Sequence, residues 1–234
     1  MNSLIKIKEI LHNSMSVSAE KAARYFKTGV GSYSENDTFI GVSNPNLRKI
    51  AKNFIYLDTE NLELLLKSNI NEERFLALII LTKQYQQHKK EEEKRKLYEF
   101  YIKNLQYVNN WNLVDASAHL IIGAYLWDKD RSLLIKLAKS KILWHRRIAV
   151  VSTLYFIRKN NLSSTFEIAS ILLQDREDLI HKAVGWMLRE AGKRNQEELI
   201  TFLDQHLNLM PRTMLRYAIE KFPENLRKSY LIKK

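Results

Sequence analysis

The sequence contains no cysteine, three prolines and six glycines among its 234 residues. Without cysteine the chain has no disulfide, no thiolate metal ligand and no cysteine nucleophile. So few turn-forming residues argue against an all-β protein, which needs a turn about every 8–12 residues. No apolar run approaches the roughly 18 residues of a transmembrane helix, and no signal-peptide pattern follows Met1. We therefore expect a soluble, cytoplasmic protein with no membrane partner.

What the chain does contain is apolar surface and positive charge. Apolar residues make up 45% of it and aromatic residues 10%, which excludes a disordered chain. Its 38 Lys and Arg residues outnumber 26 Asp and Glu residues, giving a formal net charge of +12. Such a charge favours a polyanionic partner such as nucleic acid, although solvated surface lysines are an alternative explanation. The length suits one domain over residues 1–234, or a continuous repeat array.

The spacing of apolar residues predicts an all-α protein, because they recur at helical intervals along nearly the whole chain. Ser18 precedes one expected helix, and Asn44 followed by Pro45 is typical of a helix start with Asn44 as the N-cap. Residues 29–44 hold three of the six glycines, so we expect a loop there. Four helix pairs are then expected, at Trp111–Trp127 with Arg131–Ala138, Leu143–Arg158 with Ser164–Leu173, Asp178–Gly192 with Glu197–His206, and Pro211–Phe222 with Pro223–Ile232.

A small residue recurs in the helix expected over residues 71–86 and in the first helix of each of the four pairs. The positions are Ala77, Ala118, Ala149, Gly185 and Ala218, at spacings of 41, 31, 36 and 33 residues. These spacings are typical of stacked helix-pair repeats, although alanine is common in helices and chance is the alternative. The same helices carry cations such as Arg74. We therefore predict a HEAT-like helical repeat solenoid (an ARM/HEAT superhelix) with a basic concave groove that suits duplex DNA.

Common catalytic motifs are missing. The chain has no Gly-rich phosphate loop and no clustered His pair for zinc, so we expect neither cofactor nor metal. Trp111 and Asp115 are four residues apart and share one helix face, which fits either a core Trp beside a surface Asp or a functional pair. Lys182, Trp186 and Arg189 also share a face. That stripe fits nucleic acid binding or a buried Trp flanked by cations.

The sequence resembles the AlkD-type DNA alkylation repair family, whose members are DNA glycosylases built from HEAT-like repeats. The resemblance covers nearly the whole chain, and its motifs are specific only in their order and spacing. The stretches that carry it are Tyr25–Gly29, Phe39–Pro45, Trp111–Asp115, Trp144–Ala149, Lys182–Glu190 and Pro211–Ile219.

The resemblance implies functional roles for particular residues. The family's catalytic Asp falls on Asp115, its two sugar-packing tryptophans on Trp111 and Trp186, and its phosphate-binding arginine on Arg147. The further DNA-binding residues expected on this basis are Tyr25, Lys27, Arg146, Lys182, Arg189, Arg212 and Arg216. The loop that begins at Gly29 is longer than is usual in the family, and Asn112 stands where an Asp is frequent. These departures concern the substrate range.

The implied activity is hydrolysis of the N-glycosidic bond of cationic alkylated purines, such as 3-methyladenine and 7-methylguanine, in duplex DNA during base excision repair. The expected enzyme is a monomeric alkylpurine DNA N-glycosylase. A cationic purine leaves as a neutral base, so little general-acid help is needed, and a carboxylate and two indoles stabilise the positive sugar. Two alternatives are a non-catalytic HEAT-repeat protein that binds damaged or bent DNA and a peptide-binding helical scaffold.

Overall fold

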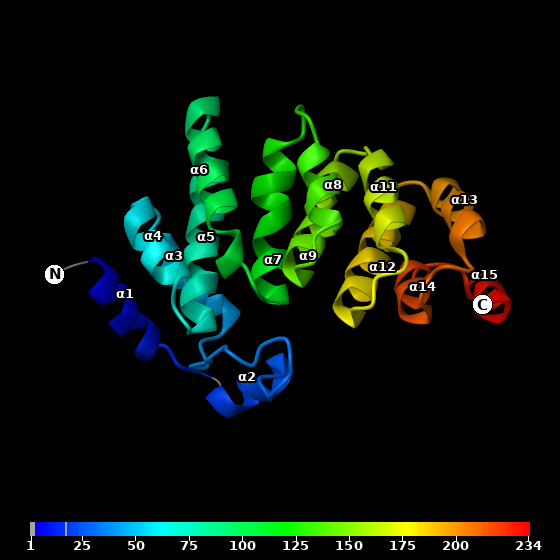
Figure 1. The fold of residues 1–234 in the computed structure, drawn as a ribbon. Helices are drawn as coiled ribbons and strands as arrows, with labels where there is room; N and C mark the ends of the chain where they lie inside the picture. The colour runs from blue at the N-terminus through cyan, green and yellow to red at the C-terminus, as the bar shows by residue number, and fades with distance from the viewer. Residues whose placement is uncertain (1–2, 17) are drawn as a thin grey trace. The chain divides into compact units, whose positions relative to one another are not determined.

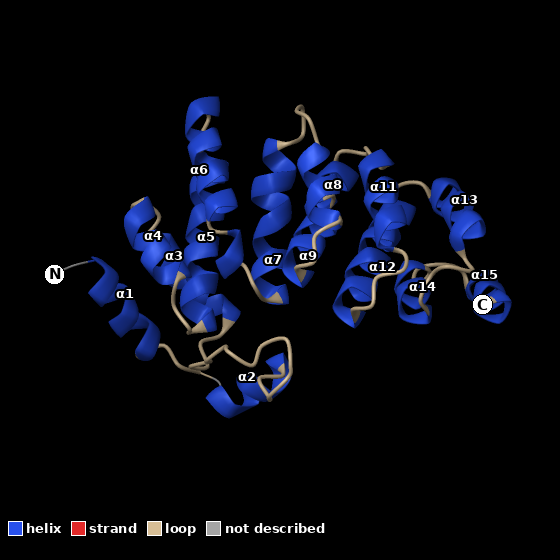
Figure 2. Ribbon diagram, viewed as in Figure 1, coloured by secondary structure: helices blue, strands red, loops and turns tan. Residues whose placement is uncertain are grey.

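The computed structural model describes residues 3–16 and 18–234, and within these ranges the chain consists of helices and loops without a β-strand (Figure 2). The predicted all-α class is therefore confirmed. The chain divides into two compact units, Met1–Ser117 and Ala118–Lys234, and each is described by itself. The helices of both are labelled in Figure 1.

The first unit is built around α5. This helix is buried along residues 71–82, and α3, α4 and α6 all pack against it (Figure 1). Residues 75–81 form an uninterrupted apolar run, which explains why the middle of the helix is buried on every side. The helices are α1 (Ser3–His12), α2 (Ala19–Phe26), α3 (Asn44–Asn53), α4 (Thr59–Leu66), α5 (Asn71–Gln87), α6 (Glu91–Lys103), the short 3₁₀ helix η1 (Leu105–Tyr107) and α7 (Trp111–Ala118), whose last residue belongs to the second unit.

The ends of α2 and α3 are close to those expected from the sequence. The Ser18 side chain accepts a hydrogen bond from the Lys21 backbone N–H at 3.1 Å, which confirms the predicted helix start. At α3 the prediction is wrong by one residue. Ser43, in an extended conformation with ψ 152°, is the N-cap, and Asn44 is already helical. Pro45 lies in the first turn, where its missing N–H costs no hydrogen bond.

The second unit consists of helix pairs in two layers. Helices η2, α9, α12 and α14 form one layer, in which each helix packs on the next. Helices α8 and α11 pack on each other and on α9, and α13 packs on α12. This arrangement confirms the predicted helix-pair repeats. The helices are η2 (His119–Gly123), a π-helical turn, α8 (Ser132–Ala138), α9 (Leu143–Ser152), α10 (Leu154–Arg158), α11 (Ser163–Leu172), α12 (Asp178–Gly192), α13 (Gln196–His206), α14 (Arg212–Ala218) and α15 (Glu224–Lys233).

The small residues predicted to lie between repeats are all buried. At Gly185 the reason is direct, because a Cβ there would lie 2.5 Å from both the Met214 carbonyl oxygen and the Tyr217 Cβ. Only glycine lets α12 and α14 approach so closely. Residues 143–158, expected as one helix, are divided into α9 and α10 at Thr153.

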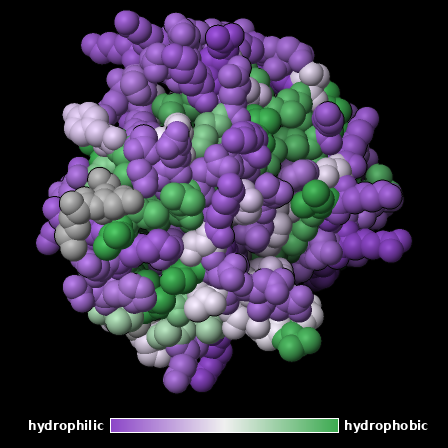
Figure 3. Space-filling model, turned by 60° about the vertical axis from the view of Figure 1, so that its left-hand side comes forward, coloured by the Kyte–Doolittle hydropathy of each residue, from purple (hydrophilic) through white to green (hydrophobic). Residues whose placement is uncertain are grey.

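The face of the molecule drawn in Figure 3 is mainly hydrophilic. Figure 3 shows polar side chains over most of the visible face, with separate hydrophobic patches between them. Among the described residues, no helix has both the length and the apolar character needed to cross a membrane.

Candidate active site

Trp111, the first residue of α7, is held by aromatic residues from the N-terminal part of the chain. The Phe26 ring stacks on the indole, with ring centroids 4.9 Å apart and planes at 17°. Tyr25 meets the same indole edge-on at 5.8 Å. The Trp111 Nε1–H donates a hydrogen bond to the Tyr33 hydroxyl at 3.2 Å. Two contacts and a hydrogen bond therefore fix the plane and the rotation of this indole.

Phe26 is itself stacked on both faces. Its second face meets Phe39, with ring centroids 4.5 Å apart and planes at 16°. Phe26 is thus layered between Phe39 and Trp111. Since offset stacking favours such arrangements beyond the apolar area they bury, this layer helps to attach α2 to the rest of the unit.

A buried polar network positions the start of α7. The Asp37 carboxylate forms an ion pair with Arg74 at 2.5 Å and accepts hydrogen bonds from Asn110 Nδ2 at 2.7 Å and Asn71 Nδ2 at 3.0 Å. Asn110 Oδ1 accepts from the Trp111 backbone N–H at 2.7 Å. The network therefore joins the loop after α2, helix α5 and the first residue of α7. The sequence-based prediction that Arg74 lines a basic groove is wrong, because Arg74 is only 3% exposed and paired with Asp37.

A second carboxylate orders the same loop. Glu72 is buried, and its Oε1 accepts hydrogen bonds from the backbone N–H groups of Gly41 at 2.9 Å and Ile40 at 3.2 Å. Gly41 has φ +83°, a left-handed conformation that strains any other residue. This turn brings Phe39 beside Phe26.

These residues enclose a cavity of about 330 Å³ in the first unit. Its lining includes five aromatic residues, Tyr25, Phe26, Phe39, Phe75 and Trp111, and also Asn71, Asn112 and Glu72. Tyr25 and Trp111, both expected at the site, are therefore brought together. The sequence did not single out Phe26, Phe39, Tyr33 or Asp37 as part of the site, because no short-range pattern links them to Trp111.

Asp115 is one helical turn beyond Trp111, and both side chains are half-buried. Residues 111–118 form one continuous α-helix, so Trp111 and Asp115 lie on the same helix face, as their spacing predicted. The π-helical turn η2 comes directly after it. Such turns occur often at functional sites.

Three of the predicted site residues, Lys182, Trp186 and Arg189, belong to α12 in the second unit. Trp186 is half-buried on this helix. Lys182 forms an ion pair with Asp178 at 2.7 Å, and the Arg189 guanidinium pairs with Glu220. Part of the positive charge along this face is thus balanced within the fold.

The two adjacent arginines of α9 have different surroundings. Arg147 is 5% exposed, and its guanidinium donates a hydrogen bond to the Leu179 carbonyl at the start of α12. Arg146 binds both carboxylate oxygens of Asp175, with Nε–Oδ2 at 2.5 Å and Nη2–Oδ1 at 3.2 Å. Bidentate pairing fixes the loop before α12 and neutralises the Arg146 charge. Burial lowers the pKa of the preceding His145, which favours its neutral form.

The remaining predicted DNA contacts are exposed. They are Tyr25, which is 68% exposed, Lys27 at the left-handed C-cap of α2, and Arg212 and Arg216 on α14. Within residues 3–16 and 18–234, no three His, Asp or Glu side chains lie close enough together to hold a metal ion.

Comparison with known proteins agrees with this fold. The family model described as DNA alkylation repair enzyme matches residues 7–222. The chain is also similar to a solved structure from Enterococcus faecalis, described as a predicted DNA alkylation repair enzyme. The two share 19% identity with a TM-score of 0.68, and the alignment covers 88% of this chain and 95% of the other. A search of the curated proteins gave no match.

The fold and the site therefore define a class of all-α proteins. These proteins are built from helix pairs and have a cavity with aromatic residues beside a Trp–Asp pair. Within that class, the chain belongs to the DNA alkylation repair enzyme family, as the match over residues 7–222 shows.

Proposed function

We propose that this protein is a DNA glycosylase that excises cationic alkylated purines, such as 3-methyladenine and 7-methylguanine, from duplex DNA. The observation that carries the proposal is the geometry of α7. This helix presents the Asp115 carboxylate one turn from an indole that Phe26, Tyr25 and Tyr33 hold in place. The family match runs through both compact units, which supports their action as one repeat domain on DNA.

The proposed chemistry uses the weakness of the substrate's own bond. Water adds to C1′ of the deoxyribose while the bond from C1′ to the purine nitrogen breaks, and its electron pair leaves with the base. The alkylated purine, cationic in DNA, departs neutral, so it needs no proton. Asp115 stabilises the developing positive charge on the sugar and accepts the proton that the water loses, and an abasic site remains.

The tryptophans and cations have separate proposed roles. The electron-rich face of Trp111 is attracted to a sugar that becomes positive, an effect worth about 0.5–2 kcal/mol. We propose that Trp186 makes the same kind of contact with the sugar, and that Arg147, Lys182 and Arg189 bind phosphates. Tyr25 and Lys27 supply contacts from α2. Phosphate contacts fix the position of the protein on DNA without reading sequence.

The decisive experiment is Asp115→Asn. We expect release of methylated purines from alkylator-treated duplex DNA to fall about 10²–10⁴-fold, because a general base is lost, while DNA affinity persists. Free base is measured by chromatography. The control Asp128→Asn removes the same charge from an exposed position and leaves release unchanged.

Two outcomes would contradict the proposal. Base release at the wild-type rate by Asp115→Asn would remove the assigned role of this carboxylate. A wild-type protein that binds duplex DNA but releases no methylated base would favour the alternative, a non-catalytic protein that binds damaged or bent DNA.

A further inference from the structure

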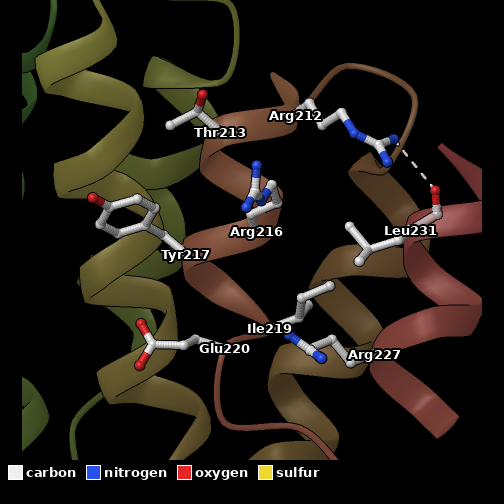
Figure 4. A pocket seen from close by; sticks show the side chains of 8 residues that line it. All are labelled: Arg212, Thr213, Arg216, Tyr217, Ile219, Glu220, Arg227 and Leu231. Carbon is white, nitrogen blue, oxygen red and sulfur yellow. Dashed lines mark hydrogen bonds between the residues drawn. The ribbon is translucent and has the colours of Figure 1, made fainter. Parts of the chain in front are cut away.

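We propose that the pocket between α14 and α15 is a phosphate-binding site that holds the backbone of duplex DNA. This inference rests on the proposed function, which makes DNA the substrate. The pocket has a volume of about 610 Å³ (Figure 4). Arg212, Arg216 and Tyr217 line it from α14, and Arg227 and Leu231 line it from α15 (Figure 4). The sequence motifs gave no role to Arg227.

Without a bound anion, the arrangement of the three arginines is unfavourable for the stability of the fold. Arg212 and Arg216 are four residues apart on α14, so they lie on one face, where like charges destabilise a helix. Arg227 adds a third positive charge from the next helix. An anion bound among them would relieve this repulsion.

The charge of the pocket is not balanced by acids that line it. Among the described residues of the lining, Glu220 is the one with a carboxylate, and its side chain already pairs with Arg189 and with Lys221, the latter at 3.2 Å. The Lys221 contact and the nearby Arg189 charge lower the pKa of Glu220. Its negative charge is therefore engaged by cations other than the three arginines.

The donors in the pocket are available for a ligand. One Arg212 N–H donates to the Leu231 carbonyl at 3.3 Å, as the dashed line in Figure 4 marks. Within the described part of the chain, no hydrogen bond or ion pair engages the guanidinium of Arg216 or Arg227. Guanidinium groups bind phosphate oxygens through pairs of parallel hydrogen bonds.

The shape favours a polymer backbone over a small anion. The pocket is larger than one phosphate needs, and Tyr217, which is 37% exposed, provides an aromatic surface for a neighbouring sugar. The net charge of +12 attracts a polyanion to the whole molecule. We therefore assign the site to a phosphodiester in duplex DNA.

Arg227→Ala and Arg216→Ala test this site in the full-length protein. Affinity for an unmodified duplex is measured by fluorescence anisotropy at several salt concentrations. Each variant should reduce the slope of log K against log salt by about 0.9, because one phosphate contact is lost. The control Arg158→Ala removes an equal charge from an exposed position at the end of α10 and leaves the slope unchanged. Circular dichroism checks that each variant folds.

The outcomes separate this inference from the proposed function. An unchanged slope in Arg227→Ala, or an equal decrease in Arg158→Ala, overturns the site. An effect seen only on duplexes with 5′-phosphate ends, or binding of inorganic phosphate without any effect on duplex binding, overturns the assignment to the backbone. If the slopes change as expected but the wild-type protein releases no methylated base, the glycosylase proposal fails and the phosphate site stands.

Discussion

Asp37 and Arg74 form an ion pair that is almost entirely removed from water, with their side chains 6% and 4% exposed. Two charges in such a place are stable only together, because each one alone would lose its hydration without compensation. Their separation by 37 residues explains why the sequence did not reveal the pair. Arg74 was predicted to line a groove because other cations occur in the equivalent helices, whereas its carboxylate partner, Asp37, lies in a distant loop.

We predict that Asp37→Ala destabilises the protein by about 3–5 kcal/mol, because it leaves Arg74 buried and uncompensated. Asn110 also loses its hydrogen bond to the carboxylate. The free energy of unfolding is measured by urea denaturation. The double variant Asp37→Leu/Arg74→Met should recover part of the loss, since apolar side chains of similar size need no partner. A loss below about 1 kcal/mol in Asp37→Ala would show that the pair is hydrated.

Helices were largely predictable because their signals are local. The Ser18 cap, the proline in the first turn of α3 and the apolar spacing of α5 each act over a few residues. The aromatic layer of Phe26, Phe39 and Trp111 was not predictable in the same way. It depends on how the loop after α2 returns to α5, and no pattern within one helix describes that path.

Gly185 tests the packing of two helices. We predict that Gly185→Ala destabilises the protein by about 1–3 kcal/mol, because the new Cβ meets the Met214 carbonyl on α14. Without that clash alanine would stabilise the helix by about 1 kcal/mol. Urea denaturation determines the sign of the change.

Gly29→Ala is the matched control, because the nearest atom to its Cβ is Ser32 Oγ at 3.9 Å. We expect this variant to unfold at nearly the wild-type urea concentration. If Gly185→Ala is as stable as the wild-type protein, then α12 and α14 can move apart without a cost in the free energy of unfolding.

At the scale of the whole molecule, the +12 charge and the repeated helix pairs were visible in the sequence, and both point to the same class of partner. The count of charged residues did not show how much of the positive charge is paired with acids within the fold. Arg146, Lys182 and Arg189 each pair with an acid in the second unit. A total charge does not show such pairs, in which an acid offsets part of the positive charge that a polyanion meets.

We predict that affinity for duplex DNA falls steeply with salt, because each phosphate contact releases a counterion. With six or more contacts, the binding constant should fall at least about 10³-fold between 50 and 200 mM salt. A duplex with and without a methylated purine, titrated over this range, provides the measurement. An affinity that stays constant up to about 0.2 M salt would contradict binding through phosphates.

Helix α2 has a capped start but no buried residue, and its ring stack with Phe39 and Trp111 involves Phe26 at its last position. From this low burial we expect the amide protons of α2 to exchange with solvent through local opening, at a lower free energy than those of the buried helix α5. Such opening would release the segment that carries Tyr25 and Lys27 before the remainder of its unit unfolds.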